Sequence, residues 1–248
     1  MESMLDEIKD YWTGRAENYS ECILDDLETG KSDHWLNIIG EHADLSKPMK
    51  ILDIGTGPGF FPMLLKGRGH DVTAIDYTQA MLDIAKKNCE ESGAEVNLLR
   101  MNAQNLEFED NTFDLILSRN LVWDLERPRQ AYREWLRVLK PNGKMLTFDG
   151  NHYLYLYDNV YANAEKKKER SHYKKTETDF GADPEVMQNI AKDLPLSKER
   201  RPQWDVNTLM ELGAQTVHIH TDGRDSNIVE YEGERVYLPN SFFIFARK

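Results

Sequence analysis

The chain has 248 residues, a length that suits one α/β domain with additions or two small domains, and we expect one. Its formal net charge of -12 argues against a broad nucleic-acid-binding face, because phosphates require clustered cations. The two cysteines, Cys22 and Cys89, lie far apart and predict neither a disulfide framework nor a zinc site. The acidic amino terminus and the absence of a long apolar run predict a soluble, cytoplasmic protein.

The first part of the chain is predicted to be helical. Apolar side chains recur at helical spacing over residues 3–43 and indicate two or three helices before the first strand. From Met49 onward, strands alternate with helices. The predicted strands are 49–54, 71–76, 95–101, 113–118 and 144–149, and the intervening predicted helices are 60–69, 78–93 and 127–140, with a turn over 141–144. This alternation indicates an α/β fold with a doubly wound, mainly parallel sheet covered on both faces.

The alternation breaks over residues 151–203. This segment holds a tyrosine cluster, a run rich in lysine, and three prolines. Tyr153, Tyr155 and Tyr157 alternate along the chain, as they would on one face of an extended segment. Regular patterns resume with a predicted helix over 204–213 and two predicted strands, 214–221 and 241–248, that can pair as a hairpin.

A glycine-rich turn follows the first predicted strand. Gly55, Gly57 and Gly59 form the pattern G-x-G-x-G, two residues after Asp53. Glycines at this point of a doubly wound sheet let the backbone approach a ligand and direct helix amides toward it. The spacing is tighter than the G-x-G-x-x-G of dinucleotide sites and suits a ligand without a pyrophosphate. Asp76 ends the second predicted strand, where a carboxylate can accept hydrogen bonds from both hydroxyls of a ribose.

Four stretches in chain order resemble the class I S-adenosylmethionine-dependent methyltransferases, in the small-molecule branch that includes the ubiquinone-biosynthesis C-methyltransferases. They are "ILDIGTGPGFF", "VTAIDYTQAML", "MNAQNLEFEDNTFDLILSRN" and "EWLRVLKPNGKMLTFD". The resemblance covers residues 49–150 and implies a Rossmann-like sheet of seven strands whose last strand is antiparallel. It therefore predicts a single methyltransferase domain over 1–248. Its parts would be a helical cover (1–46), a cofactor-binding core (47–150), a substrate-lid insertion (151–203) and a final helix with an antiparallel hairpin (204–248).

The resemblance implies a set of cofactor-binding residues for S-adenosyl-L-methionine and its product S-adenosyl-L-homocysteine. Asp53 would hold the amino group, Asp76 the ribose hydroxyls, and the turn the methionine and ribose portion. The family usually has Asp at the position of Asn102, and Asn can accept as well as donate a hydrogen bond there. The implied cofactor-binding residues are Tyr19, Asp53, Gly55, Thr56, Gly57, Gly59, Asp76, Tyr77, Met81, Asn102, Ala103, Gln104, Ser118 and Arg119.

A sulfonium is already activated, so the protein mainly has to align the reactants and exclude water. Because this chemistry requires few particular residues, the sequence marks the acceptor site less clearly than the cofactor site. His152 and Tyr153 are candidates for a catalytic role beyond the carboxyl end of the fifth predicted strand, where such sheets bind ligands. A surface loop histidine explains His152 equally simply. Candidate acceptor-binding residues are Tyr11, Asn120, Trp123, Tyr155 and Tyr157, although the tyrosines could equally pack a helix or a lid.

Alternatives concern the metal and the acceptor. Asp149, Asn151 and His152 could suggest magnesium, but "SRN" supplies no acid after the fourth predicted strand, and we expect no metal. His218 and His220 share one face of a strand without a visible third ligand. The cations of 166–170 with Lys174 and Lys175 could contact RNA, but a solvated helix face is the simpler interpretation.

The predicted function is therefore in-line methyl transfer to a small organic acceptor. An RNA or protein methyltransferase is the first alternative, and a non-catalytic cofactor-binding interaction subunit is the second. We expect no membrane partner and no nucleic-acid partner. The accepting atom and the choice between a monomer and a homodimer do not follow from the sequence.

Overall fold

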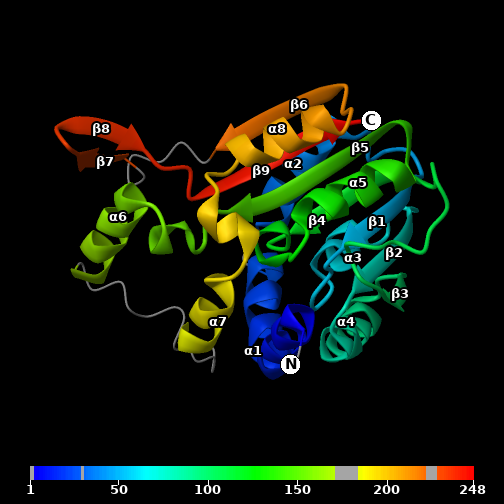
Figure 1. Cartoon of the computed structure of the whole chain (residues 1–248). Coiled ribbons are helices and arrows are strands. Elements are labelled where there is room, and N and C mark those ends of the chain that lie inside the picture. Colours follow the sequence, from blue (N-terminus) through cyan, green and yellow to red (C-terminus); the bar gives the residue numbers. More distant parts are fainter. Residues whose placement is uncertain (1–2, 29–30, 171–183, 222–227) are drawn as a thin grey trace.

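A seven-stranded sheet organises the computed structural model, which describes residues 3–28, 31–170, 184–221 and 228–248 (Figure 1). The strand order is β3-β2-β1-β4-β5-β9-β6. These strands are β1 (Lys50–Ile54), β2 (Asp71–Asp76), β3 (Asn97–Arg100), β4 (Phe113–Arg119), β5 (Leu139–Gly150), β6 (Thr216–Thr221) and β9 (Ser241–Arg247). The pairs among β1 to β5 are parallel, whereas β9 is antiparallel to both β5 and β6. The prediction of a doubly wound, mainly parallel sheet with an antiparallel last strand is confirmed.

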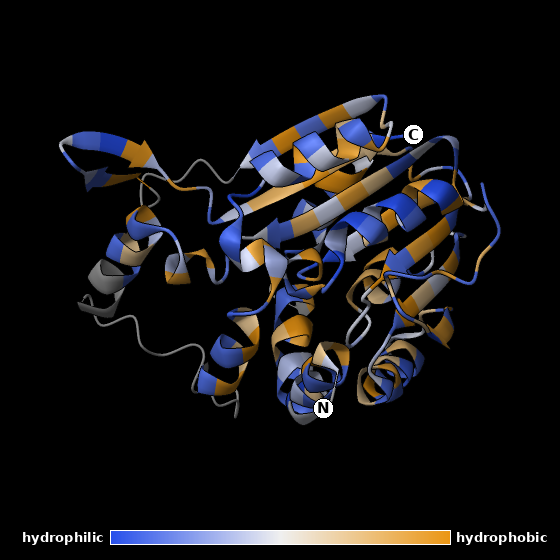
Figure 2. Cartoon of the chain, in the orientation of Figure 1, coloured by the Kyte–Doolittle hydropathy of each residue, from blue (hydrophilic) through white to orange (hydrophobic). Residues whose placement is uncertain are grey.

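The central strands are apolar on both faces because helices cover both. Ile51, Leu52 and Ile54 of β1 are all fully buried. Successive side chains of a strand point to opposite faces, so Leu52 and Ile54 pack into one core cluster and Ile51 into another. Figure 2 shows that the covering helices carry hydrophobic and hydrophilic bands side by side, as expected for helices with one buried face. Parallel strands covered in this way require continuous apolar runs.

Helices lie on both sides of the sheet. α5 has Pro128 at its start, where no partner for a backbone amide is required, and it buries Tyr132 and Trp135 against the sheet. α1 and α2 are the amino-terminal helices expected from the apolar spacing. The helices are α1 (Met4–Glu28), α2 (Ser32–His42), α3 (Phe60–Leu65), α4 (Gln79–Ser92), α5 (Pro128–Val138), α6 (Asn159–Arg170), α7 (Pro184–Ala191) and α8 (Gln203–Glu211), with 3₁₀ turns η1 (Val122–Asp124), η2 (Leu154–Leu156) and η4 (Pro195–Lys198).

Three local predictions require correction or extension. The extended conformation expected for the tyrosine cluster is wrong, because Leu154–Leu156 form the 3₁₀ turn η2. The turn expected over 141–144 is a distortion within β5, where Asn142 has a φ of 64° and the register with β4 shifts. β6 and β9 pair as expected, but a separate pair of short strands, β7 (Ile228–Tyr231) and β8 (Glu234–Tyr237), comes between them in the chain.

The insertion holds α6 and α7, and α7 packs against α1. In Figure 1, α1 and α7 lie side by side below the sheet. Lys174 and Lys175, which could contact RNA, lie outside the described residues, as do the side chains of 166–170. None of the described helices has the length and apolar character needed to cross a membrane.

Candidate functional site

The glycine turn after β1 forms the floor of a cavity. Gly55, Gly57 and Gly59 have φ values of 70°, 52° and 96°, in the left-handed region that glycine adopts readily. A Cβ on Gly55 would lie 2.8 Å from a methyl carbon of Leu121, and one on Gly59 would lie 3.2 Å from the sulfur of Cys89. Side chains at Gly55 and Gly59 would crowd these neighbours, and Gly55 and Gly57 line the cavity with backbone alone.

This cavity, called here the first cavity, encloses about 840 Å³ of space, including solvent at its mouth. Its lining combines the ends of β1, β2 and β4 with one face of α1. Of the residues implied for the cofactor, ten line it: Tyr19, Asp53, Gly55, Thr56, Gly57, Asp76, Tyr77, Met81, Ala103 and Arg119. Asn120, expected at the acceptor, lines it as well, whereas Gly59, Asn102, Gln104 and Ser118 do not.

Two strand-end carboxylates flank the turn. The carboxylate of Asp76 accepts hydrogen bonds from the backbone N–H of Gly57 at 3.0 Å and of Thr78 at 2.8 Å. Both carboxylate oxygens of Asp53 are buried without a hydrogen-bond partner among the described residues. Burial, reinforced by the nearby charge of Asp76, raises the pKa of Asp53 to about 7. A ligand in this cavity could therefore supply the hydrogen-bond donor or cation that the carboxylate of Asp53 lacks.

Asp124 is a third carboxyl group of the first cavity, and our sequence analysis did not identify it. It ends η1, is buried, and accepts a hydrogen bond from Nε1 of Trp12 at 2.8 Å. Burial raises the pKa of Asp124 to about 8, and the charges of Asp149 and Asp76 act in the same direction. No local pattern marks this residue, because its partner lies 112 positions away in α1.

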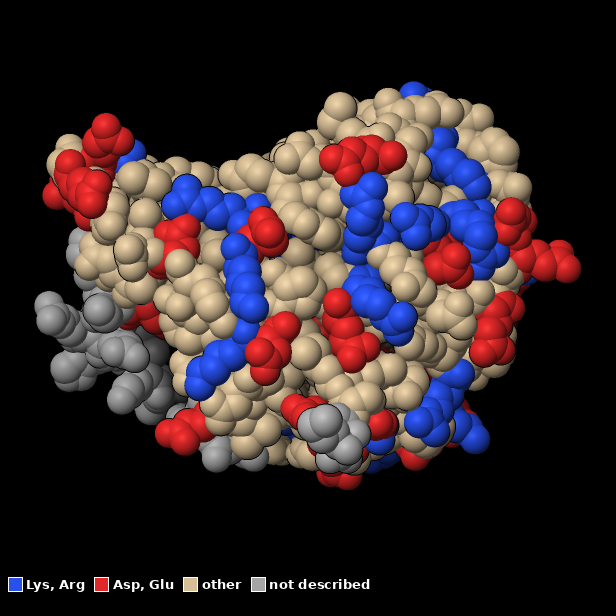
Figure 3. Space-filling model, in the orientation of Figure 1, with Lys and Arg blue, Asp and Glu red and all other residues tan. Residues whose placement is uncertain are grey.

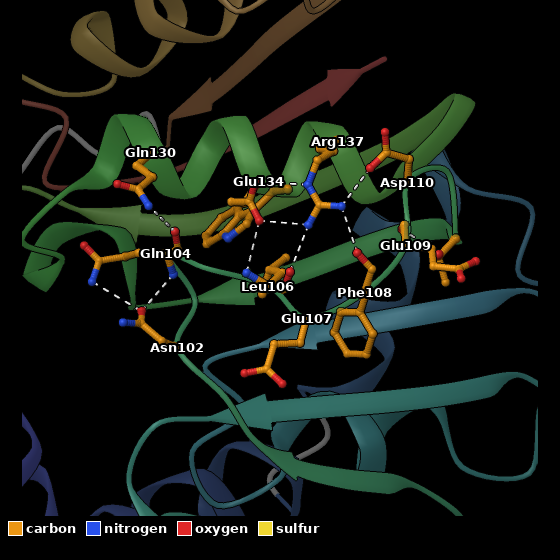
Figure 4. Close-up of polar contacts among 12 residues, drawn as sticks. Asn102, Gln104, Leu106, Glu107, Phe108, Glu109, Asp110, Gln130, Glu134 and Arg137 are labelled. Atoms are coloured by element: carbon orange, nitrogen blue, oxygen red, sulfur yellow. Dashed lines mark hydrogen bonds and ion pairs between the residues drawn. The ribbon is translucent and has the colours of Figure 1, made fainter.

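The loop after β3 reaches the cavity at Ala103, whereas the side chains of Asn102 and Gln104 do not line the cavity. Asn102 and Gln104 hydrogen-bond each other, and Oε1 of Gln104 accepts the N–H of Arg127. Figure 4 shows how Arg137 and Glu134 of α5 fix the rest of this loop through the carbonyls of Leu106 and Phe108 and the amide of Leu106. The amide side chains expected at the adenine edge are therefore used to hold the loop, while Ala103 faces the first cavity.

The end of β4 connects the cavity to the amino-terminal helix. Ser118 is fully buried, whereas the next residue, Arg119, lines the first cavity. The guanidinium of Arg119 pairs with Asp26 of α1 and lies 4.4 Å from the ring centroid of Phe60. This contact and the hydrogen bond from Trp12 to Asp124 hold α1 over the cavity.

A second cavity of about 750 Å³ lies beside the first and shares Trp12, Tyr19 and Asn120 with it. Most of its remaining lining consists of residues expected at the acceptor. These are Tyr11, Trp123, His152, Tyr153 and Tyr155, together with Arg15 and Glu165. The structure does not bring Tyr157 to this cavity: its ring is largely exposed, and its hydroxyl donates to the carbonyl of Lys192.

His152 lies beside a buried charge network. Its Nε2 is 3.6 Å from Oδ1 of Asp149, whose other oxygen is 2.8 Å from Nη1 of Arg201. Burial alone would raise the pKa of Asp149, but Arg201 holds it below its usual value. Arg201 also pairs with Asp205, and all three side chains are almost completely buried. The carboxylate considered for magnesium is thus already paired with a guanidinium.

The strand histidines have aromatic neighbours. The ring of His220 stacks on Phe243 with centroids 4.9 Å apart, and His218 tilts against Phe245 at 5.5 Å. Within the described part of the chain, no group of three His, Cys, Asp or Glu side chains is arranged to hold a metal ion.

Comparison with known proteins agrees with this geometry. Residues 52–147 match the sequence profile of a methyltransferase domain. A demethylmenaquinone methyltransferase of Paenarthrobacter aurescens is 28% identical over 162 residues, which cover 65% of this chain and 62% of that protein. A ubiquinone/menaquinone biosynthesis C-methyltransferase of Bartonella henselae is 34% identical over 156 residues, 59% of each chain. The chain thus spans about three-fifths of the length of these relatives.

The fold has solved counterparts over almost its whole length. One is the structure of a putative S-adenosyl-L-methionine-dependent methyltransferase from Methanococcus maripaludis. The match covers 94% of this chain and 91% of that chain, with 22% identity and a TM-score of 0.58. The sequence match and the shared sheet agree on one assignment. Residues 52–147 of this chain form a methyltransferase domain of the class I S-adenosylmethionine-dependent family.

Proposed function

We propose that the chain transfers a methyl group from S-adenosylmethionine, bound in the first cavity, to a small organic acceptor in the second. The observation that carries this proposal is the shared wall of Trp12, Tyr19 and Asn120. A methyl group at this junction would face both cavities. Direct displacement requires such adjacency, because the reacting atoms must approach to about 3–3.5 Å in line.

The residues of the first cavity fit the cofactor. The unpartnered carboxylate of Asp53 suits an ammonium group, and each oxygen of Asp76 keeps acceptor capacity for a ribose hydroxyl beside its backbone N–H bond. Tyr77 and Met81 offer apolar surface to an adenine ring. Burial raises the pKa values of Asp53, Asp76 and Asp124, and a ligand with a net positive charge would offset this by favouring their ionised forms.

The sulfonium supplies an activated methyl group and a neutral thioether leaving group. The acceptor donates an electron pair to the methyl carbon as the carbon–sulfur bond breaks, and the electrons of that bond remain on sulfur. An acceptor that carries a proton must then lose it. We assign this proton to His152, which lines the second cavity, and assign to Asp149 the positioning of its ring. Trp12 and Tyr19 of α1 exclude water from the junction.

The relatives support a small acceptor. They are named as methyltransferases of demethylmenaquinone and of ubiquinone/menaquinone biosynthesis. The aromatic lining of the second cavity agrees with a planar molecule of that size class. An RNA acceptor is less well supported, because Lys and Arg lie among Asp and Glu on the face in Figure 3.

An assay of S-adenosylhomocysteine release with a panel of aromatic hydroxyl, amino and carbon acceptors tests the function. We expect acceptor-dependent release that matches the methylated product in stoichiometry. Binding of both cofactor forms without release, across small molecules, RNA and protein acceptors, would instead support the non-catalytic alternative.

A further inference from the structure

Arg15 brings a positive charge to the second cavity. It lies on α1, and its guanidinium carbon is 5.6 Å from the ring centroids of both Tyr11 and Trp12. Nη1 donates a hydrogen bond to the hydroxyl of Tyr11 at 2.9 Å. Nε is buried without a hydrogen-bond partner among the described residues, and none of the ion pairs found between those residues includes Arg15. Arg15 is therefore held in place by aromatic rings, while its charge has no counterion in the part of the chain that the structure describes.

The rest of the lining is suited to a flat molecule. The rings of Trp123 and Tyr153 lie 5.5 Å apart at 30°, and the His152 ring is 5.0 Å from Trp123. These rings belong to η1 and to the segment after β5, whereas Tyr11 and Trp12 belong to α1. Aromatic walls of this kind bind planar rings through stacking and edge contacts.

The charges that line the cavity favour an anion near Arg15. Glu165 of α6 provides the one carboxylate of the described lining, and it already has an interaction with another residue. The charged Asp149 lies behind His152 and pairs with Arg201, which it shares with Asp205. A guanidinium presents a planar set of N–H donors that matches the two oxygens of a carboxylate. Tyr11 occupies part of this set, and the buried Nε has no acceptor among the residues that the structure describes.

We propose that the methyl acceptor is a planar aromatic molecule that carries a carboxylate, and that Arg15 binds this carboxylate in the second cavity. The inference rests on the proposed function, since it concerns the acceptor of that reaction. It adds the chemical class of the acceptor and the residue that selects it. Arg15 acts in binding and orientation and takes no part in bond making.

Matched neutral and anionic probes test this proposal. The protein, saturated with S-adenosylhomocysteine, is titrated in a calorimeter with 4-hydroxybenzoate, 2-naphthoate and the primary amide of each. We expect at least one carboxylate to bind about tenfold more tightly than its amide. In Arg15→Gln this preference should vanish while the amide affinity stays within about twofold. Arg15→Lys, which keeps the charge without the planar donor set, should retain part of the preference.

Arg133→Gln is the control, because Arg133 is exposed on α5 away from the cavity lining. It should keep the full preference. Equal binding of carboxylates and amides, no binding of any probe, or an equal loss of both in Arg15→Gln would each overturn the proposal. Calorimetry with S-adenosylmethionine on the same samples distinguishes failure of the proposed function from failure of this inference. Absence of cofactor binding in the wild type would refute the proposed function. Intact cofactor binding without a carboxylate preference would refute the inference alone.

Discussion

The two cavities share α1 but are otherwise built from different parts of the chain. The first is formed largely by the carboxyl ends of β1, β2 and β4, where backbone hydrogen bonds hold the glycine turn and Asp76. The second is formed by side chains of α1, η1 and residues 152–165, which pack on the sheet from outside. The difference suggests that cofactor binding depends on the rigid sheet and that acceptor choice depends on the added segments. Substitutions should therefore affect one property without the other.

The substitution expected to lower turnover most, without changing cofactor binding, is at His152. For an acceptor that must lose a proton, His152→Ala should lower kcat by about 10²-fold or more, because proton transfer by a positioned side chain contributes about 10²–10⁴-fold. The affinity for S-adenosylmethionine, measured by calorimetry, should not change. His34→Ala, an exposed histidine on α2, serves as the control. Turnover that survives in a folded His152→Ala protein would remove this residue from the reaction.

The charge network behind the second cavity should matter for stability. Arg201→Met leaves the buried carboxylates of Asp149 and Asp205 without their counterion, which should lower the free energy of unfolding by about 3–5 kcal/mol. The neighbouring Arg200 is largely exposed in its ion pair with Asp158, so Arg200→Met should cost less than about 1 kcal/mol. Urea denaturation measures both. Equal effects of the two substitutions would show that the buried network is not a stabilising unit.

The first cavity is tested at Asp76. Asp76→Ala should weaken binding of S-adenosylmethionine by about 1–3 kcal/mol, on the scale of lost hydrogen bonds to a charged group. Asp71, exposed at the other end of the same strand, provides the matched control. Calorimetry should find wild-type affinity for Asp71→Ala. Unchanged affinity for Asp76→Ala would contradict the assignment of this carboxylate to the ribose.

The last test is a pH dependence set by the buried carboxyl groups. The pKa values of Asp53 and Asp124 rise to about 7 and about 8 in the folded protein, so both hold protons there that the unfolded chain has lost. The stability of the unliganded protein should therefore fall as pH rises from about 4 to about 8. Asp124→Asn should flatten this decline in thermal unfolding scans, whereas Asp71→Asn should not. A decline of the same size in Asp124→Asn would show that Asp124 does not titrate in this range.

The sequence predicted the residues whose positions follow from strand register and missed those that long-range packing places. The positions of Asp53, Gly55 and Asp76 are set by the strands they follow, and those strands pair in register, so local pattern determines where they meet. Asp124 depends on Trp12, and Arg15 depends on packing of α1 across the sheet ends. These long-range contacts leave no periodic signal.

Side-chain direction was the other feature that the sequence did not predict. Asn102 and Gln104 occupy the expected loop, yet their amides bond each other and Arg127. Tyr157 follows the 3₁₀ turn η2, which directs it to the carbonyl of Lys192 and away from the second cavity. A period of two along the chain predicts a shared face only for an extended segment.

A crystal structure with S-adenosylhomocysteine and an aromatic carboxylate bound would test the two-cavity site most directly. We predict the ribose at Asp76, the thioether sulfur facing the junction of Trp12, Tyr19 and Asn120, and the carboxylate ring beyond that junction. An adenosyl group outside the first cavity, or a sulfur atom directed to solvent and away from the second cavity, would contradict this prediction.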